Sequence, residues 1–160
     1  PLQYQFYNPK LSTTDDYRTF VVVNNCEQGQ EIISDNQQRQ VSVAFSSRFY
    51  KKGLRPEENV IADLIVSYYV KANTYEVEEI CFDDYEDYLL GPLCKAKVTT
   101  YEINALVIDF FDTERNSVVF HSAIEGLDFT KPAMFTKELE KAVEKIITKF
   151  DNNKSIVASL

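Results

Sequence analysis

The stretch that decides the fold covers residues 97–150 and has four segments. The first is KVTTYEINALVIDFFD at Lys97–Asp112, and the second is TERN at 113–116. The third is SVVFHSAIEG at 117–126, and the last is AMFTKELEKAVEKIITKF at Ala133–Phe150. The first and third segments are β-branched, apolar runs on either side of a short polar turn, which predicts an antiparallel hairpin. In the last segment apolar residues recur at helical spacing, with lysines and glutamates on the other side. The stretch therefore predicts a β-β-α unit whose helix lies across a sheet, and it contains no catalytic motif.

A strand, a helix and a second strand precede this unit. The run Thr19–Asn24 is β-branched and apolar, and apolar residues alternate over Ala62–Asn73, so both segments are predicted strands. Ser34 and Gln37 have the spacing of a capping box, which predicts that a helix begins there. Gly53 follows two lysines after the apolar pattern of that helix, as is typical of a helix end.

The order of these elements is β-α-β-(loop)-β-β-α, which predicts an α+β fold. We expect a two-layer sandwich, in which an antiparallel sheet of about four to five strands has two helices packed on one face. A chain of 160 residues suits one domain. We assign residues 1–18 to an extended N-terminal lead-in, 19–150 to the single domain and 151–160 to a C-terminal tail.

The charge of the chain excludes several classes of partner. The formal net charge is −8, whereas nucleic-acid binding depends on lysine and arginine that neutralise phosphates. The same charge argues against docking on an anionic membrane through protein charge. The sequence also has no run of 18 apolar residues that could span a bilayer. Neither a nucleic acid nor a membrane bound directly by this chain is therefore expected.

Cysteine and histidine are too sparse for a typical zinc site. The three cysteines, Cys26, Cys81 and Cys94, form no CxxC pair, and His121 is the one histidine. No cofactor or metal is therefore expected. Cys81 and Cys94 could be bridged in an oxidising compartment or could be separate thiols, and the sequence leaves both possibilities open.

An acidic stretch with interleaved tyrosines precedes the β-β-α unit. Its seven acids are Glu76, Glu78, Glu79, Asp83, Asp84, Glu86 and Asp87, and no lysine or arginine occurs between Lys71 and Lys95. A solvated acidic loop, a contact for a basic partner and a cation site built of carboxylates are three open interpretations, although the EF-hand order is absent. Tyrosine is favoured at interfaces. We therefore predict a candidate interaction surface at Tyr75, Asp83, Asp84, Tyr85, Asp87 and Tyr88.

Four segments carry a resemblance to a known family. They are DYRTF at 16–20, KGL at 52–54 followed by ADLIV at 62–66, ALVID at 105–109 with Asp112, and VFHS at 119–122. The pattern resembles an uncharacterised domain of bacterial envelope lipoproteins, common in Bacteroidetes and proteobacteria. Where the family tends to have Trp, Arg and Gly, this chain has Phe120, His121 and Ser122, and Asp151 replaces the Pro that usually follows the last Phe.

The resemblance implies a location and no activity. It implies a periplasmic or outer-membrane domain, held at the membrane by a lipidated Cys upstream of Pro1. Our leading hypothesis is a non-enzymatic binding or protein-interaction module with an unknown protein or small molecule as partner. Its contact surface would be the 75–96 loop or the exposed sheet face, where Tyr69 and Lys71 are candidates.

Two alternatives belong to other functional classes. The first is a small-ligand carrier with an apolar pocket between sheet and helices, lined by Phe45, Phe49 and Ile146. The second is a Cys/His hydrolase, in which His121 would be oriented by Asp109 on the facing strand and would activate a cysteine. The hydrolase requires a nucleophile within reach of His121.

Overall fold

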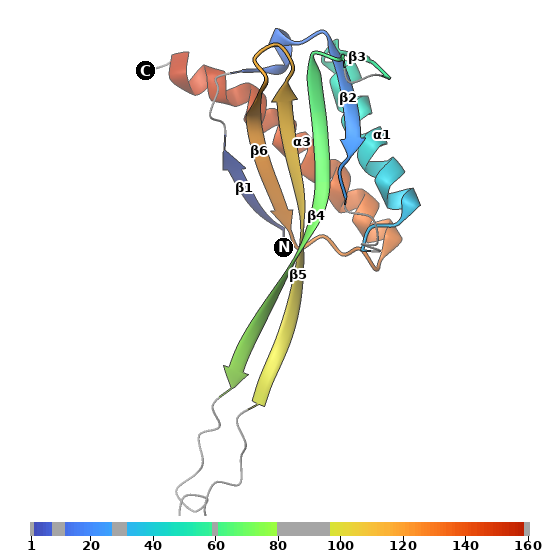
Figure 1. Cartoon of the computed structure of the whole chain (residues 1–160), viewed down its shortest axis with the longest axis vertical. Coiled ribbons are helices and arrows are strands. Elements are labelled where there is room, and N and C mark those ends of the chain that lie inside the picture. Colours follow the sequence, from blue (N-terminus) through green and yellow to red (C-terminus); the bar gives the residue numbers. More distant parts are fainter. Residues whose placement is uncertain (1, 8–11, 27–31, 59–60, 80–96, 159–160) are drawn as a thin grey trace, which may run out of the picture.

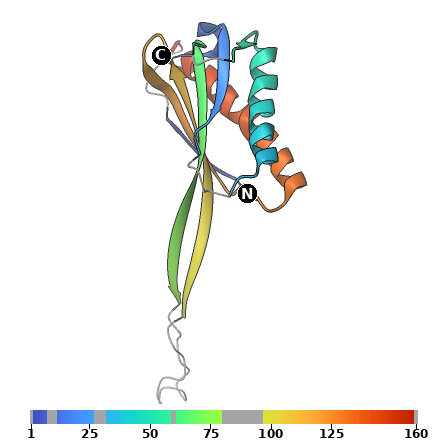
Figure 2. The same ribbon diagram turned by 45° about the vertical axis from the view of Figure 1, so that its right-hand side comes forward.

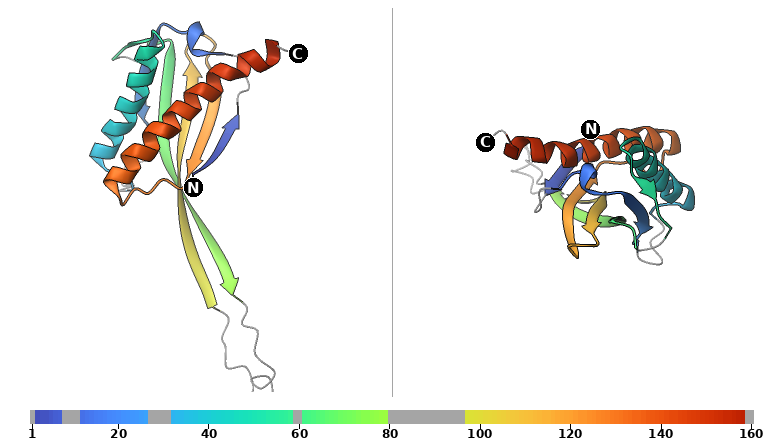
Figure 3. Two further views of the ribbon diagram at one scale, coloured as in Figure 1. Left: turned by 180° about the vertical axis from the view of Figure 1, so that it is seen from behind. Right: turned by 90° about the horizontal axis from the view of Figure 1, so that it is seen from above.

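The structure is a computed structural model and describes residues 2–7, 12–26, 32–58, 61–79 and 97–158. It has an α+β fold, in which two long helices cover one face of a six-stranded sheet (Figure 1). In chain order the elements are β1 (Gln3–Tyr7), the 3₁₀ helix η1 (Thr14–Asp16), β2 (Thr19–Asn24), α1 (Asp35–Lys51), β3 (Arg55–Pro56), β4 (Leu64–Glu79), β5 (Lys97–Asp112), β6 (Ser117–Glu125) and α3 (Pro132–Ala158). The two layers are plain when the molecule is turned (Figures 2 and 3).

The sheet corrects the prediction of four to five antiparallel strands. Its order is β1-β6-β5-β4-β2-β3, and β2 runs parallel to both β4 and β3, so the sheet is mixed. The reason lies in the connection, because α1 carries the chain from β2 back across the sheet, as parallel neighbours require. The two strands that were not predicted are β1, within the expected extended lead-in, and β3, which has two residues.

The ends of α1 confirm the capping prediction. The Ser34 side chain accepts a hydrogen bond from Gln37 N, and the Gln37 side chain accepts one from Ser34 N. At the other end Gly53 has a φ of 93°, a conformation that glycine adopts without strain. The Gly53 N–H donates to the Tyr50 carbonyl and the Leu54 N–H to the Phe49 carbonyl, which is a Schellman motif.

The last helix is longer than the sequence pattern predicts. The apolar pattern ends at Phe150, but α3 continues to Ala158, so most of the expected tail is helical. Asp151 is held at the point where the pattern stops. Its carboxylate accepts hydrogen bonds from the backbone and hydroxyl of Thr14 and forms an ion pair with Lys52, with an N–O distance of 3.0 Å. These contacts join η1, the end of α1 and α3.

Aromatic rings fill the core between the layers. Phe110, near the C-terminal end of β5, contacts the rings of Phe45, Phe49, Phe120 and Phe150 at centroid distances of 5.0–6.1 Å. All five rings are 0–1% exposed. A phenylalanine buries a large apolar area, so this cluster supplies much of the driving force for folding.

Candidate functional site

The most unusual feature of the molecule is the length of the β4–β5 pair. The two strands pair over 16 positions, from Leu64–Asp112 to Glu79–Lys97. Their outer neighbours stop earlier, because β2 pairs with β4 only as far as Tyr68 and β6 pairs with β5 only as far as Ala105. We call residues 72–79 of β4 and 97–104 of β5 the ribbon.

The ribbon stands away from the rest of the molecule, which we call the body. Figures 1 and 2 show it projecting beyond the body, away from both helices. At about 3.4 Å per residue its eight paired positions span about 27 Å. Within the described part of the chain, neither edge of the ribbon is paired with another strand. Free edges of this kind are templates for pairing with another chain.

The predicted interaction surface coincides only in part with described residues. Tyr75 lies in the ribbon, where its backbone is opposite Tyr101. The remaining candidates, Asp83, Asp84, Tyr85, Asp87 and Tyr88, lie outside the described residues. Glu76, one of the seven acids, is exposed on the ribbon opposite Thr100, which is also exposed. The acidic stretch therefore begins on the ribbon.

The face of the sheet that the helices leave uncovered carries the other predicted contacts. Tyr69 is half-buried there and Lys71 is exposed, opposite Val107 and Ala105 respectively. Further along the same face, Asp109 is directly opposite His121, and the Asp109 carboxylate is hydrogen-bonded to His121 Nδ1. The register thus brings together the histidine and the aspartate of the hydrolase hypothesis.

The described residues do not bring a cysteine next to His121, as this hypothesis requires. Across four strands the order is Tyr7, His121, Asp109 and Ser67, so Tyr7 is the hydroxyl residue next to His121, and the aspartate stands between the histidine and Ser67. A catalytic triad needs the histidine in the middle. At about 4.8 Å per strand, Ser67 lies about 10 Å from His121 across the sheet. Cys26 follows β2, three strands from β6, and Cys81 and Cys94 lie outside the described residues.

The apolar residues assigned to a ligand pocket are part of the packed core. Phe45, Phe49 and Ile146 are each 0% exposed. The Phe45 and Phe49 rings lie 6.0 Å apart and both contact Phe110, so the described core at this point is filled by protein. The pocket that the carrier hypothesis places there is not present in the described structure.

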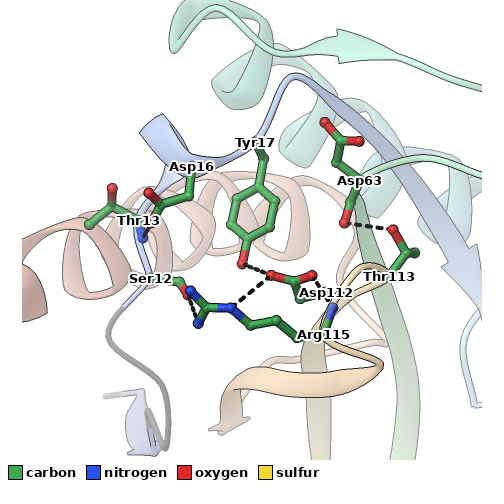
Figure 4. Close-up of polar contacts among 8 residues, drawn as sticks. All are labelled: Ser12, Thr13, Asp16, Tyr17, Asp63, Asp112, Thr113 and Arg115. Atoms are coloured by element: carbon green, nitrogen blue, oxygen red, sulfur yellow. Dashed lines mark hydrogen bonds and ion pairs between the residues drawn. The ribbon is translucent and has the colours of Figure 1, made fainter.

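A group of buried polar contacts closes the end of the sheet opposite the ribbon (Figure 4). Tyr17 Oη donates to Asp112 Oδ2 at 2.9 Å, and the Arg115 backbone N–H donates to Asp112 Oδ1 at 2.9 Å. Arg115 Nη1 also donates to Ser12 Oγ at 3.2 Å. Burial, together with the hydrogen bond to Asp112, raises the pKa of Tyr17 to about 12. Tyr17 therefore stays protonated near neutral pH and remains a donor.

Asp63 and Thr113 extend these contacts across the start of β4. The Thr113 hydroxyl donates to the Ala62 carbonyl at 2.9 Å, and Asp63 Oδ2 accepts from the Arg18 N–H at 2.9 Å. We call Ser12, Tyr17, Asp63, Asp112, Thr113 and Arg115 the polar clasp. A cleft of about 330 Å³ lies beside it. Because Asp112 is satisfied on both oxygens by protein donors, the clasp joins the lead-in to the β5–β6 turn and has a structural role.

The described part of the chain contains neither a metal site nor a membrane-spanning helix. No group of three His, Cys, Asp or Glu side chains there is arranged to hold a metal ion. None of the described helices combines the length and apolar character needed to cross a membrane.

Fold and sequence comparisons define the class and then the family. PelC from Paraburkholderia phytofirmans, solved as a dodecamer, has a similar fold, with a TM-score of 0.55 at 9% identity over 94% of this chain and 98% of PelC. A PDZ domain protein from Parabacteroides distasonis gives a TM-score of 0.54 at 10% identity, over 92% of this chain and 35% of that protein. No curated protein matches the sequence. The class is thus an α+β domain of the kind found in PelC.

The chain belongs to the family described as Domain of unknown function (DUF4136), whose model matches residues 4–150. The match begins within β1, so the lead-in is part of the domain. Asp63 and Asp112, which the sequence marks only by family resemblance, prove to be clasp residues. The sequence analysis did not predict that the ribbon projects from the body. The alternating pattern of β4 and β5 predicts the two strands, but it does not show how far the neighbouring strands pair with them.

Proposed function

We propose that the protein is a non-enzymatic protein-interaction domain whose contact element is the ribbon. The observation that carries the proposal is the eight-position extension of β4 and β5 beyond every other described strand. A two-stranded hairpin is at best marginally stable alone in water. An extension that packs on nothing in its own body adds little to folding, and a partner chain would satisfy its free edges.

The chemistry of the ribbon supports a protein partner. Its two edges offer backbone N–H and C=O groups to an added strand, which supplies affinity through main-chain hydrogen bonds. The sequence places Glu76, Glu78 and Glu79 at the end of β4, so a partner surface with cationic side chains would be electrostatically complementary.

We place this function in the bacterial cell envelope. The support is the sequence resemblance to envelope lipoprotein domains. In this proposal a lipidated Cys upstream of Pro1 holds the domain at the membrane, and the body itself makes no membrane contact. The gene product should then carry an apolar segment ending in a Cys before Pro1, and it should fractionate with membranes. A gene product without that segment that is recovered in the cytosol would contradict the location.

Site-specific photo-crosslinking in cells tests the ribbon as the contact element. A photoreactive amino acid replaces Thr100, which is exposed on the ribbon, and in the matched control it replaces Lys149, which is exposed on α3. We expect a discrete cross-linked adduct from position 100 and none from position 149. Equal labelling from both positions, or no adduct from position 100, would refute the ribbon as the contact element.

A further inference from the structure

Two large apolar side chains are exposed on the outward side of α1. Val43 is 65% exposed and Tyr50 is 72% exposed on this side, next to Ser46 and Ser47. The core side of the same helix carries Val41, Phe45 and Phe49, so α1 has apolar residues on both sides. A surface helix normally presents charged and polar residues to solvent. These two side chains make this side of α1 a candidate contact surface.

A groove lies on each side of this apolar ridge. The first, between α1 and α3, has a volume of about 440 Å³ and is lined by residues that include Arg39 and Arg48 of α1 and Leu139 and Glu140 of α3. The second, between α1 and the β2–β3 edge, has a volume of about 460 Å³ and includes Phe20 and Tyr50. Both grooves share Val43, Ser47 and Lys51. They form one continuous surface over α1, which we call the α1 surface.

The α1 surface lies in the most basic segment of an acidic protein. Between residues 35 and 56 the cations are Arg39, Arg48, Lys51, Lys52 and Arg55, and Asp35 is the one acid. Two of these cations already have partners in the body. Arg48 forms an ion pair with Glu144 at 3.1 Å, and Lys52 forms one with Asp151 at 3.0 Å. Arg39 and Lys51 form no ion pair with another described residue, and both are exposed.

The complementary charge is on the ribbon, which cannot reach the α1 surface of its own chain. Glu76 is exposed on the ribbon, and the sequence places Glu78 and Glu79 after it at the end of β4. The ribbon points away from the body, and α1 lies within the body on one face of the sheet (Figures 1 and 2). An acidic ribbon that meets this surface must therefore come from a second molecule.

We infer that the α1 surface binds the acidic ribbon of a second copy of this chain. The inference rests on the proposed function, because it names the surface that the acidic side chains of the ribbon contact. The contact is heterologous, since it joins different surfaces on the two copies. Each copy still offers one free ribbon and one free α1 surface, so association continues to a closed ring or an open filament.

Charge reversal in the purified full chain tests the inference. One variant carries Arg39→Glu and Lys51→Glu on the α1 surface, and a second carries Glu76→Lys, Glu78→Lys and Glu79→Lys on the ribbon. A control with Lys137→Glu and Lys141→Glu makes the same charge change as the first variant on exposed α3 positions outside the grooves. Mass in solution is measured by sedimentation up to about 1 mM protein, which detects weak association.

We expect the unmodified chain and the control to associate and each of the two interface variants to associate at least tenfold more weakly, about the loss of one close charge pair. Association of the unmodified chain should also weaken from about 50 mM to about 500 mM salt, because the contacts are exposed and screened. Mixing the two interface variants restores opposite charges at every contact and should recover association. Circular dichroism confirms that each variant is folded.

Two outcomes would overturn the inference. The first is an unmodified chain that stays monomeric at about 1 mM protein, which leaves no weak association to assign. The second is association that the α1 variant and the α3 control weaken equally, with no recovery on mixing. A monomeric chain whose position 100 still cross-links to a different protein in cells would leave the proposed function standing and remove only the second copy as partner.

Discussion

The two ends of β5 differ in how many contacts they make with the rest of the molecule. At Asp112 the strand enters the polar clasp, where buried polar atoms are paired and the neighbouring elements are joined. At Lys97 the same strand ends in the ribbon, where its one described neighbour is β4. One end is built to hold the fold together, and the other extends beyond it. The contrast indicates that stability resides in the body, and it agrees with the role in binding a partner that we propose for the ribbon.

The largest difference between the two regions is expected from truncating one side chain in each. Phe110→Ala removes the ring at the centre of the aromatic core and should lower the free energy of unfolding by about 3–5 kcal/mol. Ile103→Ala changes a partly exposed residue of the ribbon on the same strand and should cost less than about 1 kcal/mol. Urea denaturation measures both values. Similar losses from the two substitutions would mean that the ribbon is part of the core.

A smaller effect is expected in the polar clasp. Tyr17→Phe removes the hydroxyl that donates to the buried Asp112 carboxylate and should lower the free energy of unfolding by about 1–3 kcal/mol. The phenyl ring keeps its contact with Phe150, so the fold should be retained. Tyr7→Phe, at an exposed position on β1, is the control and should leave stability unchanged. If Tyr17→Phe is as stable as the unmodified chain, the clasp does not stabilise the body.

Alkaline pH should lower the stability of the body through the Tyr17 and Tyr68 hydroxyls. Burial raises the pKa of both Tyr17 and Tyr68 from 10.0 to about 12. A raised pKa favours the protonated form in the folded state, so this contribution to stability is complete below pH 10 and is lost as the pH rises towards about 12. Urea midpoints measured across that range should fall, and Tyr17→Phe and Tyr68→Phe should each flatten the decline. If the urea midpoint of both variants falls with pH as steeply as that of the unmodified chain, the two tyrosines are not the cause of the decline.

The smallest effect on stability is expected from removing the ribbon altogether. Lys71 and Ala105 are direct partners, so residues 72–104 can be replaced by an Asn-Gly turn that connects them. Because the ribbon contacts no other described strand, the free energy of unfolding should change by no more than about 1 kcal/mol. The melting temperature of the shortened chain checks this. A shortened chain that fails to fold would show that the ribbon supports the body.

Local signals predicted much of the fold. The alternation over β5 and β6, the capping box at Ser34 and the helical spacing after Pro132 each depend on residues close in sequence. The direction of β2 was missed because parallel pairing depends on the crossover through α1. β1 was missed because five alternating residues gain their stability only from pairing with β6.

The candidate site was less predictable than the fold. Of the interaction surface that the unusual composition predicts, Tyr75 lies in the ribbon and the other residues lie outside the described part of the chain. The exposure of Val43 and Tyr50 was not predicted, since an apolar residue on α1 has the same sequence signature whether it faces the core or the solvent. The clasp depends on contacts between residues far apart in sequence, such as Tyr17 and Asp112, which no local pattern encodes.

Amide hydrogen exchange along β5 tests the central contrast most directly, because one strand crosses both regions. In dilute protein, the hydrogen-bonded amides at 106–110 should be protected to the level of global unfolding, and those at 97–104 should exchange far faster because two strands alone are marginal. At high protein concentration the second set should become protected as ribbons meet their partners, and the first set should not change. Uniform strong protection along β5 in dilute protein would contradict the division into a body that folds and a ribbon that binds.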